Sequence, residues 1–438
     1  MVNLVLVVLF TGVILVLIQP EGVFFGFDHL IRFSDATNNI KFLVLTVSAL
    51  LIYSCRVYLS KYLTADALLV LLLSIIGMFL ALMAYDFRLM FIGLELMGIS
   101  FYILIALDKN IKSSIKAGLN YYVVGSAMTA INLLGIVMVY KSTGSFNWLN
   151  QSQINLFLGN DSTLSLGVML IIISLLFKLA AAPFHLWAPK IYGDSSLFMV
   201  IFQGLIPKMP LLFIMFSVIN FVSVSSDLSL YTLIWLSVCL SVLLGSLGLL
   251  FQSNFKTIFI YSSITNIGLA LSAVSNMSET SAQTLAVFIT IYTLMSVALA
   301  ILFFSFGTNN LRALKGLIEI NPYLAIAAAL ILFSLAGVPP LAGFYSKFSI
   351  IYNTMYNETF IVMIPLIIGS CVSAFYYLYL IKTCFLDKPE SKTPLFITYY
   401  QSLSLFVATG VVLLVSTKPW LVVIISGTML GMGETIYV

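Results

Sequence analysis

The stretch TLSLGVMLIIISLLFKLAAA (163–182) is twenty residues long and carries a single charge, Lys178. A helix needs about 20 predominantly apolar residues to cross the hydrocarbon core of a bilayer. A backbone in lipid must satisfy its own hydrogen bonds, which leaves helices or closed barrels. Barrel strands alternate polar and apolar residues over short segments, and this stretch does not. We therefore predict a membrane-spanning helix here.

The rest of the chain has the same character. Of its 438 residues, 61% are hydrophobic and only 8% are charged, whereas soluble globular proteins carry about 25% charged residues. Apolar runs separated by loop signals predict an all-α polytopic membrane protein with about thirteen spanning helices. The expected spans are 2–19, 41–60, 66–84, 87–107, 117–140, 163–182, 198–219, 228–250, 256–275, 283–306, 322–350, 358–386 and 397–415. The eleventh is too long for one straight crossing and contains GVPPLAG (337–343), which predicts a broken helix.

Loop charges separate into two groups when successive loops are assigned to alternating sides of the membrane. One side is mainly basic, with Arg56, Lys61, Lys109, Lys112, Lys116, Lys190, Lys256, Arg312 and Lys315. The other is mainly acidic, with Glu21, Asp28, Asp35, Asp86, Asp161, Asp227 and Glu279. The positive-inside rule assigns the basic side to the cytoplasm, or to the matrix of an organelle, and the N-terminus lies on that side.

Several other classes of protein are disfavoured. The net charge of +4 is spread through loops and does not form the basic cluster expected of a nucleic-acid-binding protein. The four cysteines are scattered in apolar surroundings, and no pair has metal-ligand spacing, so we expect thiols buried against lipid or in the protein core, and no metal site. The segment MVNLVLVVLFTGVILVLIQPEG (1–22) lacks the basic region and cleavage site of a signal peptide, which favours a first membrane helix.

Among the charged residues within the predicted spans, four are candidates for function, namely Glu95, Lys178, Lys208 and Lys347. At mid-helix each costs about 2.5–3.5 kcal/mol, and the four together cost on the order of 10 kcal/mol. Such residues are retained where they pair, line a hydrated path or titrate. Each also has a structural alternative. The ammonium groups of Lys208 and Lys347 can extend to the membrane interface, and Glu95 or Lys178 can serve helix packing.

The functional interpretation of these residues is a proton relay. Low-dielectric surroundings favour the neutral forms of lysine and glutamate, whereas pairing favours their charged forms. Opening or closing a Glu95–Lys178 pair would therefore release or capture a proton at Lys178. Lys178 lies five residues before Pro183, and Lys347 lies seven residues after Pro340. Such breaks expose backbone groups that need water or polar partners, and they mark transport sites.

His185 follows the first of these breaks. An imidazole titrates near neutral pH, at about 6.5, which suits proton transfer. The alternative is a hydrogen bond at the end of a helix. The other histidine, His29, lies in an acidic loop and is expected to be solvated.

Four segments carry a family resemblance: FIGLELMGISFY (91–102), FKLAAAPFHLWAPKIYG (177–193), NFKTIFIYSSITNIG (254–268) and FSLAGVPPLAGFYSKF (333–348). In this order they resemble the antiporter-like, proton-translocating subunits of respiratory complex I. Within that family they are similar to the branch called NADH-ubiquinone oxidoreductase chain 2 in mitochondria and subunit N in bacteria. The resemblance runs from about residue 65 to 385.

The resemblance implies a fold of two inverted five-helix repeats, each with a broken helix. It implies accessory helices in 1–60, a proton-translocating core in 61–390, and a final helix and tail in 391–438. Glu95, Lys178, Lys208 and Lys347 would match the family's relay residues. FMN, iron–sulfur clusters and ubiquinone would belong to other subunits, and this chain would bind no cofactor. Its partners would be other membrane-arm subunits and lipids, in the mitochondrial or bacterial inner membrane.

Some positions depart from the family pattern. Where members often have a Glu-x-x-x-Lys pair, this chain has Lys116 and Asn120, and an asparagine cannot carry the lysine's proton. A family histidine is replaced by Asn266. Three alternatives therefore stay open: a component of a multisubunit cation/proton antiporter, a structural membrane-arm subunit that no longer translocates protons, and a small-solute carrier.

Overall fold

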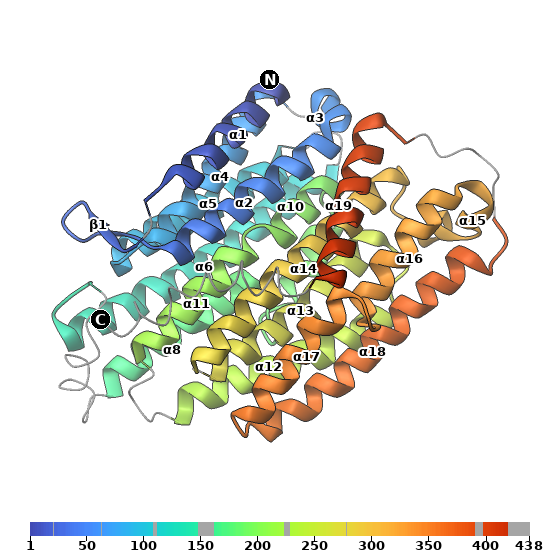
Figure 1. The fold of residues 1–438 in the computed structure, drawn as a ribbon. Coiled ribbons are helices and arrows are strands. Elements are labelled where there is room, and N and C mark those ends of the chain that lie inside the picture. The colour runs from blue at the N-terminus through green and yellow to red at the C-terminus, as the bar shows by residue number, and fades with distance from the viewer. Residues whose placement is uncertain are drawn as a thin grey trace.

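The computed structural model of the chain describes residues 1–20, 22–62, 64–107, 112–147, 162–222, 228–276, 278–389 and 397–418. Helices run side by side through the molecule, and the strands in the described part form one short hairpin (Figure 1). The predicted all-α membrane class is confirmed.

The N-terminal part consists of two long helices joined by that hairpin. Helix α1 (Val2–Ile18) packs along α2 (Asp35–Ser54), and strands β1 (Phe24–Gly26) and β2 (Ile31–Phe33) pair in antiparallel register. Ser34 caps α2 by accepting a hydrogen bond from the Thr37 amide. The helix predicted at 41–60 lies earlier in the structure: α2 begins at Asp35 and ends at Ser54, and the short α3 (Arg56–Tyr62) follows it.

A first group of helices holds Glu95 and Lys178. It comprises α4 (Ala65–Met83), α5 (Phe87–Ala106), α6 (Lys112–Thr143), α8 (Ser162–Leu179), α9 (Trp187–Gly193), α10 (Leu197–Leu205) and α11 (Lys208–Val222). Glycines let these helices approach closely. A Cβ on Gly77 would lie 2.6 Å from the Met97 nitrogen, and a Cβ on Gly135 would lie 2.6 Å from the Gly167 carbonyl oxygen. Small residues drive helix packing in membranes, where lipid and side chains are equally apolar.

A second group of helices holds Lys347. It comprises α12 (Leu228–Leu250), α13 (Phe255–Asn276), α14 (Glu279–Ser305), a 3-10 turn η1 (Leu311–Leu314), α15 (Leu317–Ile320), α16 (Pro322–Ala336), α17 (Ala342–Tyr356) and α18 (Phe360–Phe385). The last described helix, α19 (Tyr399–Thr417), packs on α14 and also contacts α2, which lies near the start of the chain (Figure 1).

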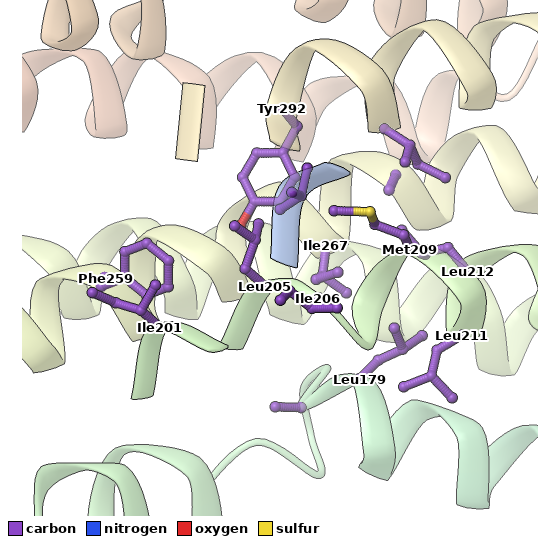
Figure 2. Packing of buried hydrophobic residues seen from close by; sticks show 14 of the residues in the cluster. Leu179, Ile201, Leu205, Ile206, Met209, Leu211, Leu212, Phe259, Ile267 and Tyr292 are labelled. Carbon is purple, nitrogen blue, oxygen red and sulfur yellow. The ribbon is translucent and has the colours of Figure 1, made fainter. Parts of the chain in front are cut away.

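The two groups meet where α10 and α11 pack against α13. Figure 2 shows this contact, with Leu205, Ile206 and Met209 beside Ile267 and Tyr292. All five side chains are buried. The predicted span 198–219 is interrupted here, because α10 ends at Leu205 and α11 begins at Lys208 after Pro207. Proline removes a backbone donor and clashes with the preceding turn, so the break was visible in the sequence and was missed.

Eleven stretches of helix in the described residues are long and apolar enough to span a membrane, and Val2–Ile18 and Pro322–Ala336 are shorter apolar helices. The predicted count of about thirteen is thus not confirmed, although each predicted span has a helical counterpart. The predicted break in 322–350 is present, because α16 ends at Gly337 in the left-handed conformation (φ +87°) and α17 begins at Ala342. The expected apolar tail, 419–430, lies outside the described residues.

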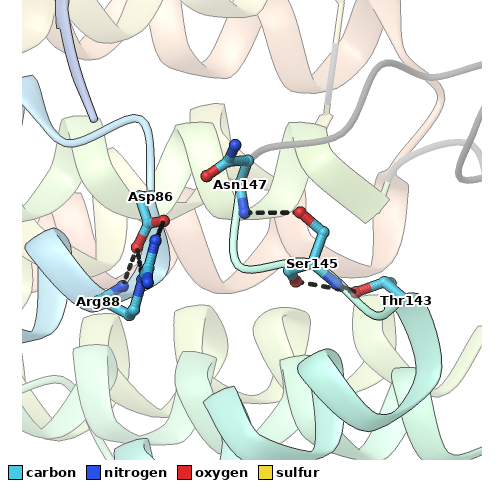
Figure 3. A network of polar contacts seen from close by, with 5 residues as sticks. All are labelled: Asp86, Arg88, Thr143, Ser145 and Asn147. Carbon is cyan, nitrogen blue, oxygen red and sulfur yellow. Dashed lines mark hydrogen bonds and ion pairs between the residues drawn. The ribbon is translucent and has the colours of Figure 1, made fainter. Parts of the chain in front are cut away.

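Contacts between loops agree with the two-sided sorting of charges. At the basic end, hydrogen bonds join Ser113 to Asp194, Lys256 to Gly193, Phe255 to Asn309 and Gly316 to Thr383. At the other end, they join Tyr85 to Leu30, Phe87 to Phe146 and Asn276 to Asn353. Figure 3 shows part of the second end, where the Asp86 carboxylate caps α5 and pairs with Arg88 at 2.7 Å.

Candidate functional site

The site centres on an ion pair between two helices of the first group. The Lys178 ammonium, on the last turn of α8, lies 3.5 Å from Glu95 Oε1 on α5. It also donates to the Leu94 carbonyl oxygen at 3.4 Å. The Lys178 side chain is 8% exposed and that of Glu95 is 23% exposed. The structure therefore brings together the two residues whose pairing the sequence predicts.

A third residue completes the contacts of the carboxylate. The Thr129 hydroxyl, on α6, donates to Glu95 Oε1 at 2.7 Å. Gly98, one turn after Glu95, leaves room for the ammonium, since a Cβ there would lie 3.5 Å from Lys178 Nζ. Thr129 is not predicted from the sequence, because the span 117–140 contains other polar residues, such as Ser126 and Asn132, and nothing there distinguishes this hydroxyl.

The chain after Lys178 turns out of helical geometry. Helix α8 ends at Leu179, and Ala180 has a positive φ of 56°. The backbone groups that the break releases find partners: the Trp187 indole donates to the Phe177 carbonyl at 3.3 Å, and Ser241 Oγ accepts from the Ala182 amide at 2.8 Å. A broken helix is tolerated in a membrane only when the freed backbone groups find polar partners, and here they do.

Lys208 stands at the second break. It is the first residue of α11, is buried, and donates to Ser263 Oγ on α13 at 2.6 Å. This places the ammonium where the two helix groups meet. The structural alternative of extension to the membrane interface does not describe this conformation.

Lys347 stands at the third break, in the second group. Its ammonium, on α17, donates to the carbonyl oxygens of Leu335 at 2.7 Å and Ala336 at 3.1 Å. These carbonyls belong to the last turn of α16, where they have no partner within the helix. A cation is also stabilised there by the helix dipole. Lys347 is buried, so it too faces inward.

His185 lies in the segment between α8 and α9 and is buried. Its Nδ1 has no hydrogen-bond partner among the described residues. The contacts of Lys178 are with Glu95 and Leu94, so the structure does not join the imidazole to that lysine directly. Its role in proton transfer stays a prediction.

The two departures from the family pattern lie in different surroundings. Asn120 is exposed on the outer face of α6. Asn266 is buried in α13 and donates to the Ser262 carbonyl at 2.8 Å, while the Ser262 hydroxyl pairs with the Tyr377 hydroxyl of α18 at 2.6 Å. A chain of hydroxyl and amide groups therefore occupies the position of the family's histidine.

Lys256 lies at the basic end, as the sorting of charges predicts, but it is buried in the first turn of α13 and is not a solvated loop charge. Its ammonium donates to the carbonyl oxygens of Gly193 and Ser195. The loop between α9 and α10 folds over the end of α13, and no periodicity in the sequence indicates that contact.

The side chains gathered at these sites are ionisable. No group of three or more His, Cys, Asp or Glu side chains in the described residues could hold a metal ion. The structure places a partly exposed carboxylate and three ammonium groups at or near helix breaks, in contact with hydroxyl and carbonyl groups. Such groups bind and release protons without a redox centre.

Residues 84–373 match the family described as NADH:quinone oxidoreductase/Mrp antiporter, TM. The chain is 31% identical over 360 residues to NADH-quinone oxidoreductase subunit N of Pelagibacter ubique, covering 79% of this chain and 73% of that one. It is 30% identical over 360 residues to NADH-ubiquinone oxidoreductase chain 2 of Marchantia polymorpha, covering 80% and 73%. A chain of respiratory complex I from Thermus thermophilus has a similar structure, with a TM-score of 0.83, 25% identity, and coverage of 96% and 92%.

Proposed function

The chain belongs to the NADH:quinone oxidoreductase/Mrp antiporter family of membrane subunits, and from this premise we propose that its buried ionisable residues carry protons across the membrane. The chain is a core membrane-arm subunit of respiratory complex I, a proton-translocating NADH:quinone oxidoreductase. Electron transfer takes place in other subunits of that enzyme. The partners of this chain are other antiporter-like and membrane-arm subunits.

The proposed relay consists of Glu95, Lys178, Lys208 and Lys347, with His185 as a further candidate. The observation that supports it is the Glu95–Lys178 ion pair at 3.5 Å beside the end of α8. Buried charges of opposite sign stabilise each other's ionised forms, and separation favours the neutral forms. Separating the pair therefore releases a proton from Lys178, and closing it captures one.

The surroundings of the relay support two further parts of the proposal. We propose that FMN, iron–sulfur clusters and ubiquinone are held by other subunits of the complex. The core lies within residues 61–390, between accessory helices in 1–60 and a final helix and tail in 391–438. The N-terminus lies on the matrix side, or on the cytoplasmic side in a bacterium, which the clustering of basic loops at one end of the molecule supports.

The test of the relay is Lys178→Met in the intact complex, reconstituted into proteoliposomes. Methionine keeps the length and loses the charge, so pumping through this subunit is expected to stop while assembly stays largely intact. The measurement is the number of protons translocated per electron transferred. Lys190→Met, at an exposed lysine on the neighbouring α9, is the matched control. A normal proton-to-electron ratio in Lys178→Met would contradict the proposal.

A second candidate is a subunit of a multisubunit cation/proton antiporter, since the family that matches residues 84–373 covers both kinds of complex. Native electrophoresis of detergent-solubilised membranes separates the two candidates. Co-migration with flavin and iron–sulfur subunits, in a band that oxidises NADH, is expected for complex I. Recovery with antiporter subunits and no redox partner supports the second candidate.

A further inference from the structure

Thr129 contacts the same carboxylate oxygen, Glu95 Oε1, as Lys178 does. Its hydroxyl has one hydrogen and two acceptors within reach: Glu95 Oε1 at 2.7 Å, and the Gly125 carbonyl of its own helix at 3.1 Å. A hydroxyl donates to one acceptor at a time. The carboxylate is favoured when it is ionised, because hydrogen bonds to charged groups are stronger than those between neutral groups. The Gly125 carbonyl provides an alternative when Glu95 is neutral.

The two contacts of Glu95 Oε1 differ in length. Thr129 lies within ordinary hydrogen-bond distance, whereas the Lys178 ammonium lies at 3.5 Å, beyond the usual range for a charged pair. Lys178 also has the Leu94 carbonyl at 3.4 Å. The hydroxyl therefore holds the carboxylate more closely than the ammonium does, and the ammonium has a second acceptor.

We propose that Thr129 is a positioning residue for Glu95: its hydroxyl retains the ionised carboxylate in place when Lys178 separates from it. This inference rests on the proposed function of the Glu95–Lys178 pair. A charged carboxylate left without any donor inside the membrane is costly. Thr129 supplies a donor that stays in contact with Glu95 while the ammonium is away, so the charge that attracts the ammonium back is retained.

Close packing fixes the position of Thr129 relative to both partners of the pair. Helix α6 lies against α5, where a Cβ on Gly118 would come within 2.9 Å of the Ala106 side chain. It lies against α8 through the mutual contact of Gly135 and Gly167. Contacts of this kind leave little freedom for a helix to slide. Movement of the pair is therefore expected at the flexible Lys178 side chain and not at Thr129.

Few other titratable groups face Glu95. On α5 itself, the Tyr102 hydroxyl interacts electrostatically with the carboxylate, and Tyr122 of α6 lies beside that ring. From α8 comes Lys178. The sequence of α4 contains one charged residue, Asp66, in its first turn, and that of α10 contains none. The proton-to-electron ratio can be measured as a function of pH. Where it falls at low pH, the groups that influence Glu95 directly are mainly Lys178 and Thr129.

The test compares Thr129→Val with Thr129→Ser in the intact complex in proteoliposomes. Valine keeps the shape and loses the hydroxyl, whereas serine restores it. In Thr129→Val, the low-pH limb of the proton-to-electron ratio should move upward by about one pH unit, as expected when a charged group loses one hydrogen bond. Thr129→Ser should return it to the wild-type position. Ser126→Ala, on the same helix with its hydroxyl on the Val123 carbonyl, is the control.

Two further variants separate this inference from the function on which it rests. Combined with Glu95→Gln, Thr129→Val should have no additional effect, because Thr129 acts through that carboxylate. Infrared difference spectra should show more protonated carboxyl in Thr129→Val than in wild type, in a band that Glu95→Gln removes. If Lys178→Met lowers pumping but the Thr129→Val profile and spectrum match wild type, the positioning role is wrong and the relay stands. Normal pumping in Lys178→Met overturns both.

Discussion

Lys178 and Lys347 both stand beside a break in a membrane helix, yet they are held by different kinds of partner. The Lys178 ammonium faces a carboxylate on another helix at 3.5 Å. The Lys347 ammonium is held by two backbone carbonyls, at 2.7 and 3.1 Å, at the end of the helix that precedes its own. A carboxylate can move away or take up a proton, whereas a backbone carbonyl can do neither. The charge of Lys178 is therefore open to control by its partner, and that of Lys347 depends on the geometry of the break.

The difference suggests a division of roles. At the first break, separation of two side chains changes the free energy of the charged lysine by a large amount, because an unpaired buried charge is costly. At the break beside Lys347, the two carbonyls stabilise a cation continuously, so we expect this lysine to exchange a proton only when water enters the break. We therefore expect the Lys178 site to switch and the Lys347 site to transmit.

The largest expected effect comes from Lys347→Arg. A guanidinium stays charged in proteins, so it can still donate to the Leu335 and Ala336 carbonyls but cannot release a proton. If Lys347 transmits protons, the complex should assemble normally and its proton-to-electron ratio should fall as far as in Lys178→Met. The ratio is measured in proteoliposomes against NADH oxidation in the same sample.

A normal proton-to-electron ratio in Lys347→Arg would show that Lys347 is a structural cation, which only donates hydrogen bonds to the carbonyls at the end of α16. Lys178 and Lys347 could then no longer be compared as two residues of one relay. Lys347→Met separates a proton-carrying role from a structural one further. It removes the titratable group and also the N–H donors to the Leu335 and Ala336 carbonyls. It should then lower thermal stability, because two buried carbonyls lose their donor at about 1–3 kcal/mol each.

A smaller effect is expected from Gly337→Ala, which alters the break without touching a charge. Gly337 has a φ of +87°, and an added Cβ would lie 3.1 Å from Lys347 Cδ. The left-handed conformation costs an L-residue about 1–2 kcal/mol. Alanine should lower the melting temperature of the complex and partly reduce the proton-to-electron ratio. Gly410→Ala, on α19 with nothing within 4 Å, should change neither.

The comparison also shows which features the sequence could predict. The cost of burying Glu95 and Lys178 made their pairing a reasonable expectation, because unpaired charges are rare in membrane spans. The break at GVPPLAG followed from the conformational limits of proline and glycine. Both predictions depend on properties of single residues or short segments, and the structure contains the pair and the break.

What the sequence could not predict depends on contacts between distant segments. Thr129 lies 34 residues from Glu95 along the chain, and nothing in the periodicity of its helix indicates which neighbour it faces. Lys256 is the first residue of the predicted span 256–275, and its sequence neighbours do not indicate that the Gly193–Ser195 backbone accepts hydrogen bonds from its ammonium. The carbonyl partners of Lys347 carry no side-chain signal at all.

The smallest effect is expected at Lys208, which is held by a third kind of partner, the Ser263 hydroxyl at 2.6 Å. A hydroxyl is both donor and acceptor, so it can follow either protonation state of the lysine. Ser263→Ala removes one bond to a charged group, worth about 1.5–3 kcal/mol, and water can replace part of it. The proton-to-electron ratio should fall less than in Gly337→Ala, and Ser272→Ala on the same helix is the matched control.

If the proton-to-electron ratio falls as far in Ser263→Ala as in Lys347→Arg, the role of Ser263 must be larger than that of a partner for Lys208. Ser263 would then pass the proton itself, and the neighbouring hydroxyl pair of Ser262 and Tyr377 at 2.6 Å would become the next candidate for a carrier. Tyr377→Phe tests that candidate, because it removes the hydroxyl and keeps the ring. A normal ratio in Tyr377→Phe would confine proton transfer at this level to Lys208 and Ser263.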